Sequence, residues 1–279
     1  MTKTIVHIIH GMKEHMGRYQ KFIEFLEEND LLAIGEDLEG HGQAALDEER
    51  LGVFRGNWFD IVEDQIDFIK RYRAKYPDYR YILLGHSMGS LLARNIVSFD
   101  SSLVDGLILT GTGQVPSIIP SSGYQMARVI EKSKGPLFHS NILDNLSLGQ
   151  FNKTFEEETG VEWLSRDRAV QDAYLSDPLC NFMPTVSMYK GIFEGGSFVT
   201  KERNIAKIRK DLPILILSGE DDPVGEMGKG VHRFKDILDA LKFEHVLTKL
   251  YPEARHEVLN ELNKQEVYQD ILNWIKTSH

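Results

Sequence analysis

Residues 81–93 read Tyr81-Ile82-Leu83-Leu84-Gly85-His86-Ser87-Met88-Gly89-Ser90-Leu91-Leu92-Ala93. Strand-forming residues lead into Gly-His-Ser-Met-Gly, and a helix-forming run at 91–99 follows it. The G-x-S-x-G pattern therefore stands in the context that it requires, a strand, a sharp turn and a helix. Gly85 and Gly89 lack a Cβ, so the strand and the helix can approach closely. The turn is expected to hold Ser87 above the end of a sheet, beside the electropositive amino end of the helix, which suits a nucleophile and a developing oxyanion.

The composition is that of a globular protein large enough to bury a full core, with 279 residues, of which 42% are hydrophobic and 27% are charged. The formal net charge of −10 argues against a nucleic-acid partner and against adhesion to an anionic membrane surface. The single cysteine, Cys180, excludes an intramolecular disulfide and favours a reducing compartment, so we expect a cytoplasmic protein. We also expect no signal peptide and no integral membrane segment, because no apolar run is long enough.

Strand-like and helix-like segments alternate along the chain. Strands are predicted at 4–9, 31–35, 81–84, 106–110, 214–218 and 243–250, and helices at 18–28, 58–76, 91–99 and 263–276. This alternation predicts the α/β class, with a mostly parallel sheet of about six strands and helices on both faces. Ligands of such sheets bind outside the carboxyl ends of the strands, which is where Ser87 is expected.

The segment between the strands at 106–110 and 214–218 is about a hundred residues long, far more than a crossover connection requires. We therefore divide the chain into a core, residues 1–113 and 205–279, and a cap inserted at residues 114–204, with a helical patch at 163–175. The cap is rich in large apolar side chains, which form either its own small core or part of a pocket above Ser87. The candidates for substrate binding are Phe138, Phe155, Phe182, Met183 and Ile192.

A serine nucleophile needs a histidine base and a carboxylate that orients it, in the chain order Ser, Asp or Glu, His. His256 follows the predicted strand at 243–250 by a short loop and precedes the last helix, so it is expected at the carboxyl edge of the sheet. His245 falls within that predicted strand and His139 falls in the insertion, so neither is well placed.

The carboxylate is expected in the acidic loop that follows the strand at 214–218, which contains Glu220, Asp221 and Asp222. Pro223 restricts the backbone of Asp222 to extended conformations and so gives its side chain a defined direction. We therefore prefer Asp222 to Asp221 as the partner of the base.

The oxyanion hole is expected to combine the backbone N–H of Met88, which follows the nucleophile, with that of Met12, which lies in the loop after the first strand. We expect His10 and Gly11 to shape this loop and His10 to have a structural rather than a catalytic role. No metal is implied, because the chain has neither a His-Glu-x-x-His pattern nor a cysteine cluster.

These motifs resemble those of the α/β-hydrolase superfamily and, within it, of monoacylglycerol lipases and lysophospholipase-like serine hydrolases, a branch related to the serine aminopeptidases. The matching pieces span the chain: His10-Gly11-Met12-Lys13-Glu14-His15 with Arg18-Tyr19, Asp37 with Gly40-His41-Gly42, Gly85-His86-Ser87-Met88-Gly89, residues 219–224, and Arg255-His256.

The resemblance implies a triad of Ser87, Asp222 and His256, an oxyanion hole at Met12 and Met88, and a cap that shapes an acyl-chain pocket. It implies hydrolysis of monoacylglycerol- or lysophospholipid-like carboxylic esters, without a cofactor, and a small-molecule acyl ester as the partner. Such enzymes usually carry two further strands before the one predicted at 4–9. One edge of the sheet is therefore expected to be shortened or covered in another way.

Two other functions stay open on the sequence. One is hydrolysis of an amino-peptide amide, as in related serine aminopeptidases, in which Glu156, Glu157 and Glu158 would anchor the substrate amine. The other is a non-catalytic binding protein on a hydrolase scaffold, since a fold does not guarantee a function.

Overall fold

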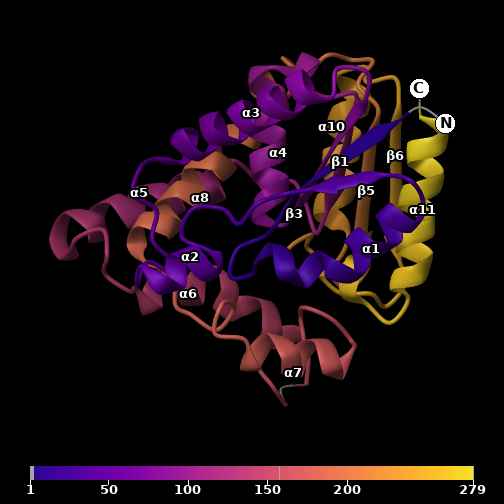
Figure 1. Cartoon of the computed structure of the whole chain (residues 1–279). Coiled ribbons are helices and arrows are strands. Elements are labelled where there is room, and N and C mark those ends of the chain that lie inside the picture. The colour runs from indigo at the N-terminus through magenta and orange to yellow at the C-terminus, as the bar shows by residue number, and fades with distance from the viewer. Residues whose placement is uncertain (1–2, 157, 279) are drawn as a thin grey trace.

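A computed structural model describes residues 3–156 and 158–278 (Figure 1). One six-stranded sheet runs in the order β2-β1-β3-β4-β5-β6, and each neighbouring pair in it is parallel. The strands are β1 (Thr4–Ile9), β2 (Leu32–Ile34), β3 (Arg80–His86), β4 (Gly106–Thr110), β5 (Ile214–Gly219) and β6 (Val246–Tyr251). The predicted α/β class with a parallel sheet of six strands is confirmed.

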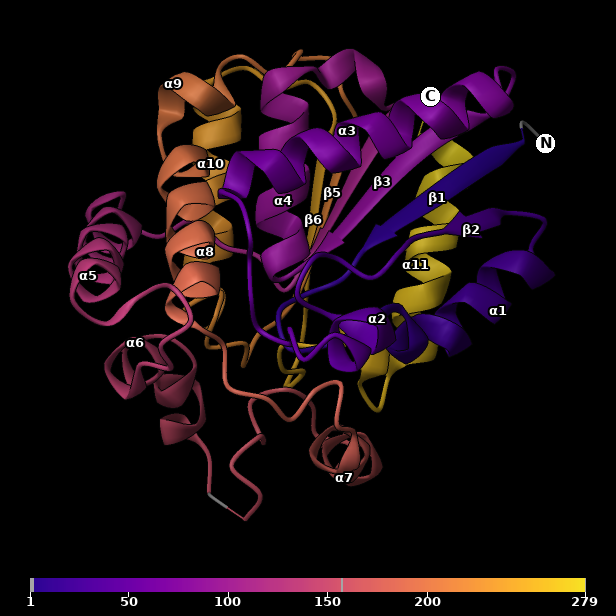
Figure 2. The same ribbon diagram turned by 60° about the vertical axis from the view of Figure 1, so that its left-hand side comes forward.

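Helices cover both faces of the sheet (Figures 1 and 2). One face carries α1 (Gln20–Glu28) and α11 (Lys264–Thr277), and the other carries α3 (Trp58–Lys75), α4 (Met88–Phe99) and α10 (Lys229–Ala240). Successive side chains of a strand point to opposite faces. In β3, Leu83 accordingly packs into the core under α3 and α4, whereas Ile82 and Leu84 pack into the core under α1 and α11.

The remaining short elements of the α/β core are η1 (Met16–Tyr19), α2 (Gly42–Asp47), η2 (Ser101–Leu103) and η4 (Val258–Asn260). Strand β2, at one edge of the sheet, contains only three residues. A very short edge strand offers few unpaired backbone groups to another chain. This agrees with the expectation of a shortened edge.

The long segment between β4 and β5 forms α5 (Ile118–Lys134), α6 (Asn141–Leu146), η3 (Leu148–Thr154), α7 (Arg168–Ser176), α8 (Val186–Val199) and α9 (Glu202–Ile205). In Figure 2, α6 and α7 lie beyond the carboxyl ends of the central strands, and α5 lies outside α8. Helix α8 instead packs against the core, because Met188 joins the cluster that contains Trp58 and Leu92.

Several predicted boundaries differ from the structure by three residues or more, including the start of α4, which is Met88 rather than residue 91. Helix α7 begins at Arg168 rather than near 163, because the Asp167 side chain accepts the N–H of Ala169 and caps the helix there. Strand β6 begins at Val246, so His245 precedes the strand instead of lying within it. Within the described residues, no helix is both long enough and apolar enough to cross a bilayer.

Candidate active site

Ser87 lies at the sharp turn between β3 and α4, with φ of 52° and ψ of −116°. A positive φ is uncommon for a residue with a Cβ and costs conformational energy. Close packing holds the turn in place: a Cβ on Gly89 would collide with the carbonyl oxygens of Ile9 and His10, and one on Gly85 would collide with the carbonyl of Gly89. The N–H of Ser87 donates to the carbonyl of Thr110 at 3.0 Å, which ties the turn to β4.

His256 and Asp222 form a buried hydrogen-bonded pair. His256 Nδ1 lies 3.0 Å and 3.1 Å from the two carboxylate oxygens of Asp222. Asp222 also accepts the Val224 N–H at 2.9 Å and the Ser218 hydroxyl at 3.2 Å. With Nδ1–H donated to the carboxylate, Nε2 keeps a lone pair that can accept a proton. Asp221, the other acid considered, is exposed.

The environment of His256 raises its pKa above the ordinary value. Burial alone would lower this pKa, but the charge and hydrogen bond of Asp222 outweigh burial, with further contributions from the charges of Glu257 and Glu14. The neighbouring His86 ring lies 4.8 Å from that of His256 between centroids. Burial lowers the pKa of His86 to about 4, so His86 is neutral near pH 7.

Met88 and Met12, whose N–H groups are expected to donate to the oxyanion, lie in two different backbone segments that line the cavity with Ser87. Met88 is the first residue of α4, where N–H groups have no partner inside the helix. Met12 lies in the loop after β1, and both methionines line the same cavity as Ser87. His10 holds this loop: its Nε2 accepts the Leu38 N–H at 2.9 Å and its Nδ1 lies 2.7 Å from the Gly11 carbonyl oxygen.

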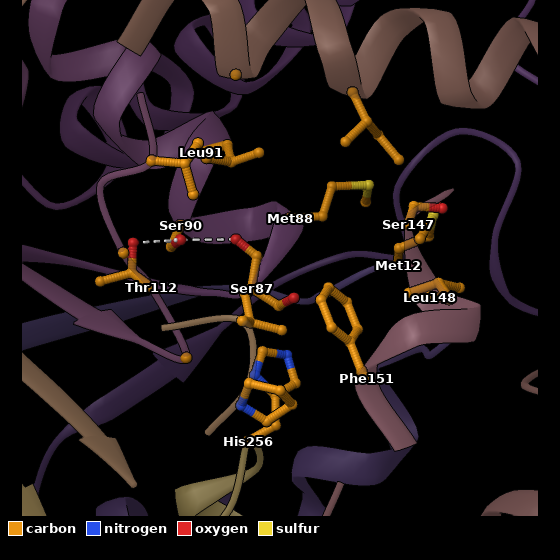
Figure 3. A pocket seen from close by; sticks show the side chains of 18 of the residues that line it. Met12, Ser87, Met88, Ser90, Leu91, Thr112, Ser147, Leu148, Phe151 and His256 are labelled. Atoms are coloured by element: carbon orange, nitrogen blue, oxygen red, sulfur yellow. Dashed lines mark hydrogen bonds between the residues drawn. The ribbon is translucent and has the colours of Figure 1, made fainter. Parts of the chain in front are cut away.

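A cavity of about 560 Å³ is lined by both Ser87 and His256, which lie far apart in the sequence (Figure 3). Ser90 also lines the cavity, and its hydroxyl donates to the Ser87 carbonyl at 2.6 Å and lies 2.9 Å from the Thr112 hydroxyl. The rest of the wall is mostly apolar. It includes Met12, Met88, Leu91, Val115, Ile119, Leu146, Leu148, Phe151, Trp163, Leu164, Ile192, Phe193 and Val224. A volume of this size suits a small-molecule ligand.

Of the five apolar residues considered for substrate binding, Ile192 lines this cavity and the other four lie elsewhere. Phe138 is 41% exposed on the surface. Phe155 lies under the Arg255 guanidinium, 4.4 Å from it. Phe182 packs on the core and contacts the His41 ring, and Met183 lies beside Gly52. These four positions depend on how the 114–204 segment folds, which its composition did not reveal.

Of the three acids considered as an anchor for a substrate amine, the two that the structure describes, Glu156 and Glu158, do not line the cavity. Glu156 and Glu158 are exposed, and Glu158 pairs with Arg168 at 2.9 Å. Glu157 lies outside the described residues.

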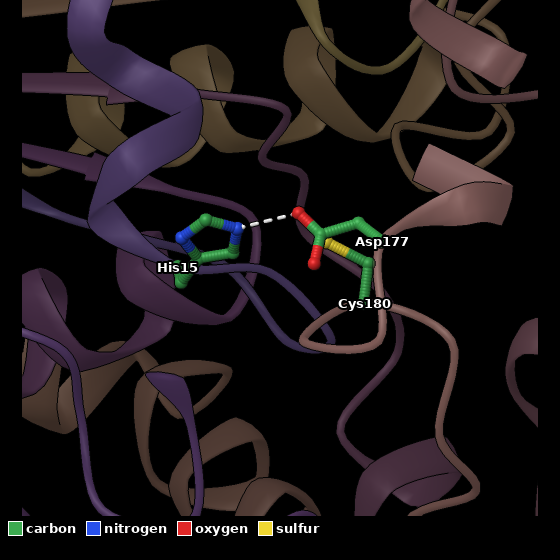
Figure 4. Close-up of side chains that lie close together, drawn as sticks. All are labelled: His15, Asp177 and Cys180. Atoms are coloured by element: carbon green, nitrogen blue, oxygen red, sulfur yellow. Dashed lines mark hydrogen bonds and ion pairs between the residues drawn. The ribbon is translucent and has the colours of Figure 1, made fainter. Parts of the chain in front are cut away.

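His15, Asp177 and Cys180 bring potential metal-ligand atoms within 4.8 Å of one another (Figure 4). Both ring nitrogens of His15 already have protein partners. Nε2 lies 2.8 Å from the Asp177 carboxylate, and Nδ1 accepts the Gly17 N–H at 3.2 Å. Burial raises the pKa of the Cys180 thiol to about 12, so this sulfur is protonated and poorly suited to a metal. The cluster is therefore a contact between the loop after β1 and the 114–204 segment.

The sequence did not single out Trp163 and Leu164, which hold the histidine loop. The carbonyl of Trp163 accepts the His256 N–H at 3.2 Å, and that of Leu164 accepts the Glu257 N–H at 2.8 Å. The Trp163 ring also lies 5.0 Å from the His256 ring. Hydrogen bonds between backbone groups do not depend on the side chain, so the sequence does not reveal them. The tryptophan in the short apolar patch at Trp163 is only a weak signal that this segment packs near the site.

A family model described as Hydrolase_4, Serine aminopeptidase, S33, matches residues 1–263. The chain belongs to this family. Monoglyceride lipase from Rattus norvegicus is 29% identical over 270 residues, which cover 94% of this chain and 81% of the relative. Monoacylglycerol lipase from Mycolicibacterium smegmatis is 24% identical over 274 residues, covering 97% of this chain and 87% of that protein.

The structural comparison agrees with the sequence comparison. A carboxyl esterase from Bacillus coagulans in complex with glycerol superposes with a TM-score of 0.92 and 28% identity, covering 99% of this chain and 90% of that one. The α/β-hydrolase fold and the resemblance to monoacylglycerol lipase-like hydrolases are thus confirmed.

Proposed function

We propose that this protein is a serine hydrolase of monoacylglycerol- or lysophospholipid-like esters, acting through Ser87, His256 and Asp222. At the coarser level, its family and relatives make it a carboxylic ester hydrolase of the lipase type. The observation that carries the proposal is the buried pair of His256 and Asp222, which opens on the same mostly apolar cavity as the Ser87 turn.

The proposed mechanism follows from the hydrogen bond between His256 Nδ1 and Asp222, which leaves Nε2 free to accept a proton. His256, whose Nδ1–H is donated to Asp222, takes the Ser87 hydroxyl proton at Nε2 as the serine oxygen attacks the ester carbonyl. The N–H groups of Met12 and Met88 receive the oxyanion. His256 then protonates the leaving alcohol, and water repeats the two steps on the acyl-enzyme.

We assign the acyl chain to the apolar wall of the cavity and the role of a cap to residues 114–204. Much of this wall comes from that segment, including Leu146, Leu148, Phe151 and Phe193. Each buried methylene contributes about 0.8 kcal/mol, so a chain that fills the cavity gains affinity with every carbon until the space is full.

The test compares glycerol monoesters of two to twelve carbons below the concentration at which they form micelles. We expect kcat/KM to rise by about 15-fold per two carbons and then to level off. A flat response would remove the acyl pocket from the proposal.

Two controls accompany this series. Ser87→Ala should stay folded and lose about a millionfold in kcat, so a folded variant that keeps 1% or more of the activity would show that Ser87 is not the nucleophile. An aminoacyl arylamide, the substrate expected of an aminopeptidase, should be turned over far more slowly than the best ester.

A further inference from the structure

Arg18 lies between the two loops that carry the proposed catalytic groups. Its side chain is 10% exposed, and those of its two carboxylate partners, Glu14 and Glu257, are each 4% exposed. Nη1 and Nη2 of Arg18 contact the two oxygens of Glu257 at 2.5 Å and 2.7 Å, and Nη1 also lies 3.4 Å from Glu14. Its guanidinium also faces the Tyr174 ring of α7 at 5.0 Å.

We propose that Arg18 is a positioning residue that couples the oxyanion loop to the loop of His256 and balances the negative charge beside that histidine. This inference rests on the proposed function for the identity of the groups that it positions. Arg18 and Glu257 form a bidentate pair with two parallel N–H···O contacts. Such a pair fixes the orientation of the two side chains as well as the distance between them.

Each of the two carboxylates that pair with Arg18 is directly linked to the backbone next to a proposed catalytic group. Glu257 follows His256 in the chain. Its carboxylate also accepts the Asn260 side-chain amide at 3.1 Å, its carbonyl accepts the Asn260 N–H, and its own N–H donates to the Leu164 carbonyl. On the other side, Glu14 accepts the N–H of Gly11, the residue before Met12, and the Tyr19 hydroxyl at 2.8 Å. A shift of Arg18 would therefore reach both loops at once.

The charged and titratable groups that face His256 come from several elements. Asp222 follows β5, Glu257 precedes η4, Glu14 lies between β1 and η1, and the His86 ring at the end of β3 lies beside that of His256. Arg18, in η1, pairs with Glu14 and Glu257. The three carboxylates favour the imidazolium, and Arg18, which is paired with two of them, offsets part of their negative charge. His256 must be neutral to accept a proton. By offsetting the charge of Glu14 and Glu257, Arg18 keeps these two carboxylates from raising the pKa of His256 so far that it stays protonated.

The chain offers a matched control in Arg166, whose Nε lies 3.0 Å from Glu261, a fully buried carboxylate. Arg166 joins the inserted segment to the loop after β6, and its side-chain partners are Glu261, Glu253 and Asn263 rather than the two carboxylates beside His256. Loss of either arginine removes a half-buried ion pair, so stability falls in both cases.

The experiment titrates the His256 imidazole by NMR in a Ser87→Ala background and, in parallel, follows the pH dependence of kcat/KM with Ser87 intact. Arg18→Met should raise the pKa of His256, and should move the acid limb of the kcat/KM profile to higher pH, by about half a unit or more. Glu257→Gln should shift both in the opposite direction. The double variant should return close to the wild-type value. Arg18→Lys, which keeps the charge but loses the bidentate pair, should leave the limb in place while lowering kcat by about tenfold.

The outcomes separate the two proposals. If Arg18→Met and Arg166→Met destabilise the protein equally and neither shifts the pKa of His256, the ion pairs of Arg18 only stabilise the fold and the inference fails. If the titration shifts as expected but no Ser87-dependent ester hydrolysis is found, the charge coupling stands and the proposed function fails. Equal losses of kcat in Arg18→Lys and Arg166→Met would overturn the positioning role.

Discussion

At the scale of single residues, the acidic loop after β5 separates two neighbouring aspartates by environment. Asp222 is fully buried and holds His256 Nδ1, while Asp221 is exposed and donates its N–H to the Ala254 carbonyl. The side chain of Asp222 has no freedom to turn away, because its oxygens also accept the Ser218 hydroxyl and the Val224 N–H.

Asp222→Asn should lose about ten-thousandfold in kcat near neutral pH, because an amide favours the wrong tautomer of His256. The charge of Asp222 raises the pKa of His256, so its loss should also move the acid limb of the pH profile to lower pH. Asp221→Asn should stay within a few-fold of wild type in the same assay. If Asp221→Asn is the damaging change, the carboxylate is assigned to the wrong residue.

Much of this residue-scale picture was predictable because Ser87, Asp222 and His256 each follow a recognisable strand. The contacts of Trp163, Glu257 and Arg18 were not predictable, since they join positions more than ninety residues apart through backbone carbonyls and an ion pair. Neither local periodicity nor motif spacing encodes such pairings.

At the scale of elements, α8 anchors the 114–204 segment to the core. A methyl group on Gly195 would collide with the indole of Trp58, which is 1% exposed and cannot move aside. The carbonyl of Gly195 also lies 3.4 Å from the Asn95 amide of α4. The sequence analysis predicted no helix at 186–199, and only the packing shows that Met188 belongs to the main core and not to a separate core of the insertion.

Gly195→Ala should destabilise the protein by about 1–2 kcal/mol, because overpacking a filled core outweighs the gain in helix propensity. Its neighbour provides the control: a methyl group on Gly196 would approach Pro120 no closer than 3.3 Å, so Gly196→Ala should unfold near wild type. Urea unfolding of both variants measures the difference. Equal free energies of unfolding would mean that α8 can move away from α3 at little cost.

At the scale of the whole molecule, several histidines are buried in their neutral form. Burial lowers the pKa of His7 and of His41 to about 3 and that of His86 to about 4. In the unfolded chain each histidine binds a proton near pH 6.5. Between that pH and about 4, the unfolded state therefore binds more protons than the folded state, and stability must fall as the pH falls.

His7→Asn isolates one of these contributions. Each buried neutral histidine should weaken folding by about 1.4 kcal/mol for every pH unit below 6.5, so the variant should show a shallower loss of stability between pH 6 and pH 4.5 by that amount. Asparagine at position 7 retains a polar group for the Tyr81 hydroxyl, which lies 3.0 Å from His7 Nδ1.

His245 supplies the control, because its side chain is 57% exposed before β6 and its replacement by Asn should leave the slope unchanged. Free energies of unfolding in urea, measured at several pH values, give the three slopes. If His7→Asn and His245→Asn both follow the wild-type slope, the acid sensitivity does not come from the buried imidazoles. It then comes from carboxylates such as Glu14, whose pKa burial would raise but which neighbouring groups, including the charge of Arg18, lower overall.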